Sequence, residues 1–399
     1  MFKKFVANDP IVEEVQGILD EGDYFSASGE EEENHQAYCR FGFWYKTPNL
    51  KHFPYDLVME LTHKQKEKLA GQLEALGGKL CQYFLQTEKS PATDYDVENN
   101  QVISKNIEGL TLWSKAFNAE QKTINNLPLQ KNGELLKTNM SIKIKGLSGI
   151  GVVSWFLGED DLHCDNFGLV DKGNKLRVYK FDHDRMFVHI FKQIAFDDVY
   201  YLFDPSLDYS YIGYSLMEFP EEIKQDKEHI NKAYKMIHQI TQSPIEEIEE
   251  IINATISDEF EAERLRLIEA ISDRQLSLME QSQEDVNYLT YIYSTELLNK
   301  NAVHLSGDYL GYTPLQEAIE TENTILILSL LRAGVKIDGK CYPLGKEIYR
   351  GKEIKEVLLE YSHGHSSDDK ISMEITQLLQ DQYGLAEDPE QSAKRIKVG

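Results

Sequence analysis

The spacing of apolar residues changes part-way along the chain, and this change constrains the fold more than any other feature. From about Phe219 onwards apolar residues recur at helical spacing, whereas the earlier part mixes short strand-like runs with helical segments. Strands and helices that are segregated along a chain are typical of α+β proteins. We therefore predict an α+β fold in which a mixed domain is followed by a mainly helical region.

Strand candidates occupy the first 180 residues. Residues 38–45 are mostly aromatic and predict one strand, and residues 102–104 predict a second, short one. Residues 167–170 and 176–179 predict two further strands, and the Gly-Asn turn between them favours a hairpin.

The candidate helices have recognisable start and stop signals. Leucines at helical spacing predict a helix over residues 55–75 that ends at the two glycines 77 and 78. Another helix is expected from Leu147. The Ser-Pro-Ile-Glu sequence at residues 243–246 predicts a helix start, and residues 257–280 predict an amphipathic helix.

The chain is strongly acidic, and this excludes some functions. With 42 Lys and Arg against 67 Asp and Glu, its formal net charge is −25. Sequence-independent binding of nucleic acid requires a basic face, so we expect no nucleic-acid partner. The four cysteines form no CxxC pair, which argues against a zinc site or a disulfide framework. No long apolar run follows the N-terminus, so we expect a soluble protein without a secretory signal.

One internal segment resembles an ankyrin repeat. Residues 311–338 contain the Thr-Pro-Leu turn of that family, with Gln316 where the family usually has His. A weaker second unit is expected from Tyr342, with a helix over residues 354–361. The resemblance implies contact with another protein. The expected organisation is a mixed domain over 1–290, which the family resemblance given below divides near residue 105, then about two ankyrin repeats over 291–365 and a polar tail over 366–399.

The segment whose side chains could take part in a chemical reaction is Asp161-Leu162-His163-Cys164-Asp165-Asn166, which follows an apolar stretch. Asp182-His183-Asp184 begins 16 residues after Asn166, at the end of the expected hairpin. Phosphoryl transfer from ATP needs one carboxylate to orient the attacking hydroxyl, and a carboxylate with an amide to hold Mg²⁺. The hairpin would return the second acidic segment to the first.

This pattern resembles the catalytic loop and metal motif of phosphoinositide 3-/4-kinases, within the protein-kinase superfamily. Together with the ankyrin-like segment, it is most similar to Legionella-type ankyrin-repeat effectors with a lipid kinase domain. The resemblance implies a two-lobed, ATP- and Mg²⁺-dependent enzyme that phosphorylates a phosphoinositide. It also implies a bacterial effector that reaches the host cytoplasm without a signal peptide, acts at host membranes and contacts a host protein through its ankyrin repeats.

The resemblance also implies roles for individual residues. Asp161 would be the catalytic base and His163 a γ-phosphate contact. The metal ligands would be Asn166 and Asp182, with Asp184 as a competitor because His183 stands where common kinases have Phe. Upstream, residues 102–109 resemble the hinge between lobes, and the expected cofactor-binding residues are Lys46, Lys105 and Glu108.

Four other interpretations remain open at this point. The acidic loop is also compatible with a structural Asx-rich loop, with an atypical protein kinase or with a catalytically inactive ankyrin scaffold. Its histidines and aspartates would also suit a metal-dependent phosphohydrolase. A lipid kinase of this acidity needs a local basic face, for which four lysines near the loop are candidates: Lys143, Lys145, Lys172 and Lys175.

Overall fold

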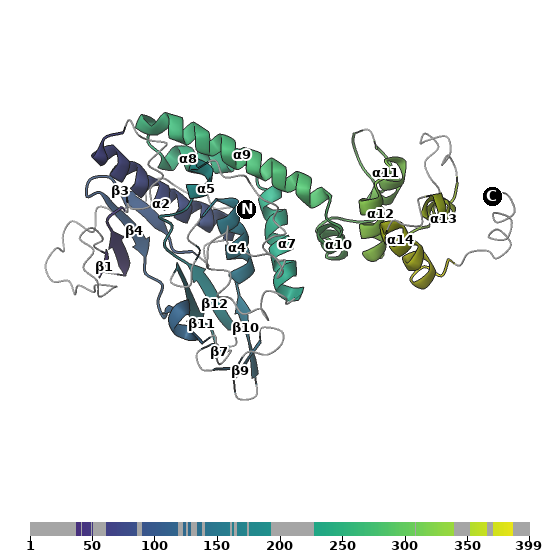
Figure 1. Cartoon of the computed structure of the whole chain (residues 1–399), viewed down its shortest axis with the longest axis horizontal. Helices are drawn as coiled ribbons and strands as arrows, with labels where there is room; N and C mark the ends of the chain where they lie inside the picture. The colour runs from purple at the N-terminus through teal and green to yellow at the C-terminus, as the bar shows by residue number, and fades with distance from the viewer. Residues whose placement is uncertain are drawn as a thin grey trace. The chain divides into compact units, whose positions relative to one another are not determined.

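The fold is of the mixed α+β class, as predicted from the change in apolar spacing (Figure 1). A computed structural model describes residues 37–40, 42–48, 50, 61–85, 90–118, 123–124, 127–128, 134–137, 140–159, 162, 166–173, 175–192, 227–307, 309–338, 352–364 and 370–385. These residues form two compact units. The first contains the described residues up to 192 together with residues 245–269, and the second contains residues 227–244 and those from 270 onwards.

A four-stranded antiparallel sheet begins the first unit. Its strand order is β1-β2-β4-β3, with bounds Ala37–Arg40, Phe43–Lys46, Gln101–Lys105 and Thr93–Asp96 respectively. The prediction of one strand over residues 38–45 is wrong, because the segment is a hairpin. Gly42 has φ +80°, a conformation that glycine adopts without steric cost, and it turns the chain between β1 and β2. The strand expected at 102–104 is confirmed as β4.

Helix α2, His63–Leu85, packs on this sheet against β3 and β4. The prediction that it ends at Gly77 and Gly78 is wrong, since it continues for seven residues beyond them. The two glycines permit close packing. A Cβ on Gly77 would lie 3.0 Å from His183 Cβ, and one on Gly78 would lie 2.6 Å from Thr93 Cβ. Residues 51–60, where the helix was predicted to begin, lie outside the described residues.

A five-stranded sheet forms the other half of the first unit. Its order is β5-β11-β12-β10-β9, with bounds Thr111–Leu112, Phe167–Asp171, Lys175–Lys180, Met140–Lys145 and Glu134–Lys137. The β11–β12 pair is antiparallel, which confirms the predicted hairpin, and β10 runs parallel to β12. Helix α4, Leu147–Phe156, confirms the helix expected from Leu147 and packs against both α2 and β12.

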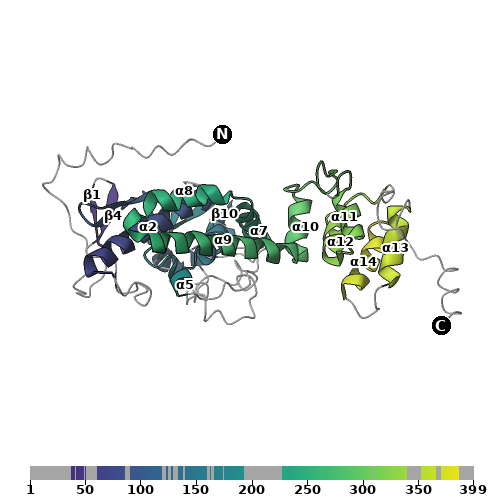
Figure 2. The same ribbon diagram turned by 90° about the horizontal axis from the view of Figure 1, so that it is seen from above.

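Several short elements and two helices complete the first unit. Helix α8, Ile245–Thr255, begins within one residue of the predicted start and packs on α2 (Figure 2). Helix α9, Glu261–Gln283, confirms the predicted amphipathic helix and continues into the second unit. The short elements are α3 Trp113–Ala116, β6 Phe117–Asn118, β7 Thr123–Ile124, β8 Leu127–Pro128, α5 Val188–Phe191 and the 3₁₀ turn Asp258–Phe260.

The second unit is helical. Its helices are α7 Lys227–Thr241, α10 Val286–Ser294, α11 Pro314–Glu320, α12 Thr324–Arg332, α13 Ile354–Gly364 and α14 Lys370–Asp381. Helix α11 begins with a capping box, in which Thr313 Oγ1 accepts from the Gln316 amide and Gln316 Oε1 accepts from the Thr313 amide. Helix α13 confirms the helix expected over 354–361, whereas the segment from Tyr342 lies outside the described residues. None of the described helices has the length and apolar character that crossing a bilayer requires.

Candidate functional site

Lys46 lies at the centre of a cluster of carboxylates in the first unit. Its Nζ is 2.8 Å from Asp182 Oδ1, 3.1 Å from Asp184 Oδ2 and 3.5 Å from Glu74 Oε1. The lysine is the last residue of β2, the glutamate belongs to α2, and the two aspartates follow β12. Three elements that are remote in the chain therefore converge on one ammonium group.

The local backbone explains how the two aspartates reach this position. Asp182 has φ +59°, in the left-handed region, which aspartate tolerates better than most side chains. This conformation turns the chain sharply as it leaves β12. The Asp182 side chain remains about one third exposed, whereas the side chains of Glu74 and Asp184 are 5% and 12% exposed.

The electrostatics of the cluster follow from burial and charge. Burial alone would lower the pKa of Lys46, but its three carboxylate neighbours outweigh this effect and hold the pKa well above its usual value. Burial raises the pKa of Glu74 to about 8, although Lys46 opposes the shift. For Asp182, burial acts in the opposite direction, but the Lys46 ammonium holds the pKa well below its ordinary range. The cluster thus keeps a charged ammonium beside a charged carboxylate.

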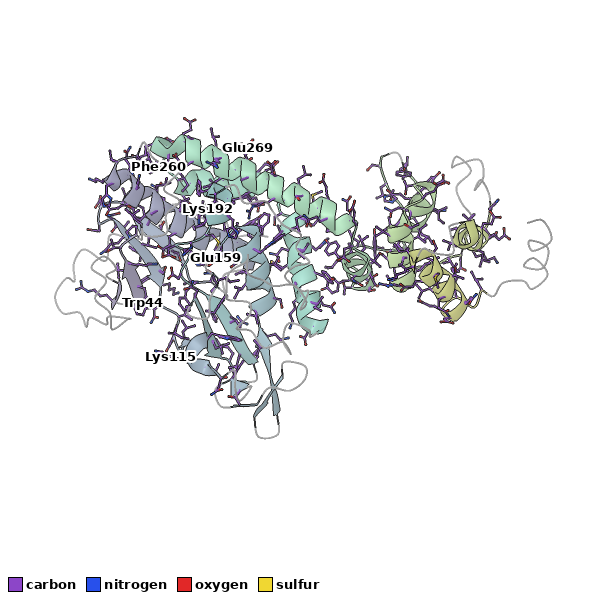
Figure 3. All side chains as sticks on the ribbon, viewed as in Figure 1. Trp44, Lys115, Glu159, Lys192, Phe260 and Glu269 are labelled. Atoms are coloured by element: carbon purple, nitrogen blue, oxygen red, sulfur yellow. The ribbon has the colours of Figure 1, made fainter. Side chains whose placement is uncertain are left out.

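A second ion pair adjoins this cluster through the backbone of Asp182. Lys180 Nζ is 2.7 Å from Glu159 Oε1, and both side chains are essentially inaccessible to solvent. Glu159, labelled in Figure 3, follows α4. The Lys180 ammonium also donates hydrogen bonds to the backbone carbonyls of Phe181, at 3.2 Å, and Asp182. This pair was not predicted from the sequence. A signal was present, because Lys180 follows the buried Leu176 and Val178 at alternate positions of β12 and so belongs to its apolar face.

His183 is buried between the two aspartates, and its ring is directed away from them. Its Nδ1 lies 3.9 Å from Cys81 Sγ, and its Nε2 lies 3.3 Å from Ser90 Oγ. Burial holds the pKa of His183 well below its usual value, so the ring is neutral. Burial also raises the pKa of the Cys81 thiol to about 12, which leaves it protonated and unreactive at neutral pH. The contacts of the His183 ring with Cys81 and Ser90 therefore help to hold the loop after β12 in place.

The remaining predicted site residues are placed as follows. Asp161 and His163 lie outside the described residues. Asn166 is buried just before β11, and its backbone carbonyl accepts a hydrogen bond from the Phe181 amide at 3.2 Å. The β11–β12 hairpin thus returns the chain to the Asn166 loop, as predicted.

Lys105 and Glu108 are both exposed, the former at the end of β4 and the latter in the following turn. In the strand register Lys105 pairs with Phe43, whereas Lys46 pairs with Val102. The two lysines therefore occupy opposite ends of the β2–β4 ladder, and the structure brings only Lys46 to the carboxylates.

The oxygen atoms of this site are of the kind that a hard divalent cation binds, although no three His, Cys, Asp or Glu side chains among the described residues are grouped so that they could hold a metal ion. Mg²⁺ prefers carboxylate and amide oxygens, and Asp182, Asp184 and Asn166 supply both kinds near the end of β12. Both aspartates already direct an oxygen at one positive charge, the Lys46 ammonium. One oxygen of Glu74, Oε2, is buried without a hydrogen-bond partner among the described residues. With its pKa raised to about 8, Glu74 is largely protonated at neutral pH, so Asp182 and Asp184 are the carboxylates that face the Lys46 ammonium.

A family model matches part of the chain. Residues 113–276 match the family described as the LepB N-terminal domain, which corresponds to about two fifths of the chain. The matched region contains the β11–β12 hairpin with Asp182 and Asp184, but it excludes Lys46 and Glu74. No curated protein sequence matches the chain.

Proposed function

We propose that the first unit is a two-lobed, kinase-like enzyme that transfers a phosphoryl group from ATP with the help of Mg²⁺. The observation that carries this proposal is the 2.8 Å ion pair between Lys46 and Asp182, with Glu74 as the second partner of the same lysine. A strand lysine paired with a helix glutamate, and facing the aspartate that holds the metal, is the arrangement that positions ATP in kinases. The four-stranded sheet with α2 would form one lobe, and the five-stranded sheet with its helices the other.

Each residue of the site would have a separate role in phosphoryl transfer. Lys46 would bind the phosphates, and Glu74 would hold the lysine extended towards them. Asp182, Asp184 and Asn166 would hold Mg²⁺, which when bound supplies positive charge next to the phosphates. Asp161 would orient the acceptor hydroxyl, and His163 would contact the transferred phosphate. Catalysis would then rest on positioning and on electrostatic stabilisation of the transition state.

The proposed acceptor is the inositol ring of a phosphoinositide, a choice that rests on the resemblance of residues 161–182 to phosphoinositide kinases. The region over residues 291–365 would contain about two ankyrin repeats and would contact a host protein. The packing of α11 against α12, with the capped Thr-Pro turn at the start of α11, supports that part of the proposal. The setting would be a bacterial effector in the host cytoplasm, peripheral at membranes.

The test is transfer of radiolabelled phosphate from ATP in the presence of Mg²⁺, to phosphoinositide vesicles and to a protein extract in parallel. Lys46→Met removes the proposed phosphate ligand and is expected to reduce transfer about 100-fold or more. The matched control is Lys79→Met, because Lys79 also pairs with an aspartate, Asp94 at 2.9 Å, but on the exposed surface. It should retain the activity of the unchanged protein.

The outcomes separate the candidate functions. Label in lipid that depends on Lys46 supports the proposal. Label in protein alone assigns a protein kinase instead. If the unchanged chain labels neither acceptor and binds no ATP analogue, phosphoryl transfer is refuted and an inactive scaffold takes its place.

A further inference from the structure

We propose that Lys180 and Glu159 are positioning residues that hold the segment after β12, which carries Asp182, against the end of α4. The pair itself is independent of the proposed function, whereas its consequence for phosphoryl transfer rests on that function. Glu159 lies two residues before Asp161 in the chain, and Lys180 lies two residues before Asp182. One buried ion pair thus connects the chain just after α4 to the last residue of β12.

The contacts of the lysine define what it positions. Its Nζ lies 2.7 Å from Glu159 Oε1 and donates to the carbonyls of Phe181 and Asp182. The carbonyl of Asp182 belongs to the residue whose backbone is in the left-handed region. A non-glycine residue in that region costs conformational energy and persists only where surrounding contacts hold it. The Lys180 ammonium supplies such a contact.

The glutamate side of the pair is equally fixed. The Glu159 amide donates to the Ser154 carbonyl at 3.0 Å, which anchors the glutamate to the end of α4. Just upstream, the carbonyls of Leu157 and Gly158 accept from the amides of Phe187 and His189 at 3.1 and 2.9 Å. Hydrogen bonds, in addition to the ion pair, therefore join the residues after α4 to the residues after β12.

Stability alone does not account for two buried charges at this position. Removing charges from water is costly, and apolar residues of similar volume commonly serve a core as well as a buried ion pair does. An apolar pair, however, cannot donate to the carbonyls of Phe181 and Asp182. The charged pair performs a task that packing cannot, namely to hold the Asp182 backbone where its carboxylate meets Lys46.

The experiment uses the full chain and three variants. Lys180→Met/Glu159→Leu replaces the ion pair by an apolar pair, Lys180→Arg keeps both the charge and the donors, and Lys79→Met is the surface control. The first readout is the thermal unfolding midpoint. The second is the rate at which Lys46 is acetylated by acetic anhydride, followed by mass spectrometry. A lysine whose Nζ is held against Asp182 and Asp184, with its side chain 21% exposed, is poorly accessible to the reagent and reacts slowly.

A positioning role predicts that the apolar double variant unfolds near the temperature of the unchanged protein, while Lys46 is acetylated about tenfold faster. Lys180→Arg should keep the slow rate, as should Lys79→Met. Phosphoryl transfer by the double variant should fall about tenfold in kcat, with a smaller change in the KM for ATP. Acetylation does not require ATP, so this readout remains decisive if the chain transfers no phosphate.

Two results would overturn the inference. A folded apolar double variant in which Lys46 is acetylated at the original slow rate would show that the pair positions nothing. If that variant does not fold, a fourth variant, Lys180→Gln, decides, because it removes the ammonium group from the pair. Acetylation of Lys46 at the original slow rate in folded Lys180→Gln contradicts the positioning role, and faster acetylation supports it.

Discussion

Lys46 Nζ lies 2.8 Å from Asp182 Oδ1, although 136 residues separate the two in the chain. The pair joins the antiparallel sheet that begins the first unit to the loop after β12 of the second sheet. Glu74 of α2 is the third member, and Asp184 completes the group around the ammonium. This arrangement carries the proposed function and leads to specific expectations for the residues around it.

The two aspartates should differ in their effect on metal dependence. Asp182 is more exposed than Asp184 and lies closer to Lys46, so it is better placed to accept a cation from solvent. We expect Asp182→Asn to raise the Mg²⁺ concentration needed for half-maximal transfer about tenfold or more, and Asp184→Asn to raise it less. Titrating activity with Mg²⁺ measures both. Equal, small effects would remove both residues from the metal site.

Gly77 should be intolerant of a side chain, unlike a glycine in another helix. A Cβ at Gly77 would lie 3.0 Å from His183 Cβ, in the loop that carries both aspartates. We expect Gly77→Ala to destabilise the protein by about 1–3 kcal/mol, because the added methyl overpacks this contact. Urea unfolding measures the change.

The matched control for this substitution is Gly151→Ala in α4, where an added Cβ would meet nothing within 4 Å. Alanine is favoured over glycine in a helix, so we expect this variant to be more stable by about 0.5–1 kcal/mol. Destabilisation of equal size at both positions would contradict the close approach at Gly77.

His183 should make the protein acid-sensitive. The folded protein holds the ring neutral, because burial and the nearby Lys180 lower its pKa, and the attraction of Asp182 does not compensate. In the unfolded chain the ring gains a proton below its ordinary pKa of about 6.5, so the stabilising effect is complete above that pH and is lost as the pH falls. The contribution to the unfolding free energy should fall by up to about 1.4 kcal/mol per pH unit.

Comparing the unchanged protein with His183→Gln by urea unfolding at pH 7 and pH 5.5 isolates this term. The comparison is needed because Glu74, whose pKa is raised to about 8, contributes a slope of opposite sign between its unfolded and folded pKa values. Identical pH dependence in the two proteins would show that His183 does not remain neutral when buried.

The capping box at the start of α11 should stabilise that helix locally. Thr313 Oγ1 accepts from the Gln316 amide, so Thr313→Ala should cost about 1 kcal/mol. Faster hydrogen exchange of the first α11 amides reports the loss. Thr376→Ala in α14 is the control, because its hydroxyl donates to the Ser372 carbonyl within a helix and caps no end. Unchanged exchange in Thr313→Ala would show that the box does not secure the helix start.

Local pattern was sufficient to predict many of the elements. The hairpin over 167–179, the helix from Leu147 and the strand at 102–104 are confirmed, because each depends on alternation, spacing or a turn within a short segment. Lys46 was also identified from sequence as a candidate, and the structure places it among the acidic residues.

Features that depend on distant neighbours could not be predicted in this way. Gly77 and Gly78 have the sequence signature of a helix end, but their role is set by His183 and Thr93, which lie elsewhere in the chain. The ion pair of Lys180 with Glu159 joins a strand to a helix end, and no local rule connects the two positions. The turn at Gly42 was missed because the aromatic residues around it form one uninterrupted strand-like run.

The position of Asp182 in the chain, well after Lys46 and Glu74, determines when the cluster becomes complete during synthesis. Residues 37–105 contain the whole first sheet and α2, and they are synthesised before β12 exists. Lys46 and Glu74 therefore leave the ribosome before their aspartate partners. Residues 180–184 complete the cluster last during synthesis.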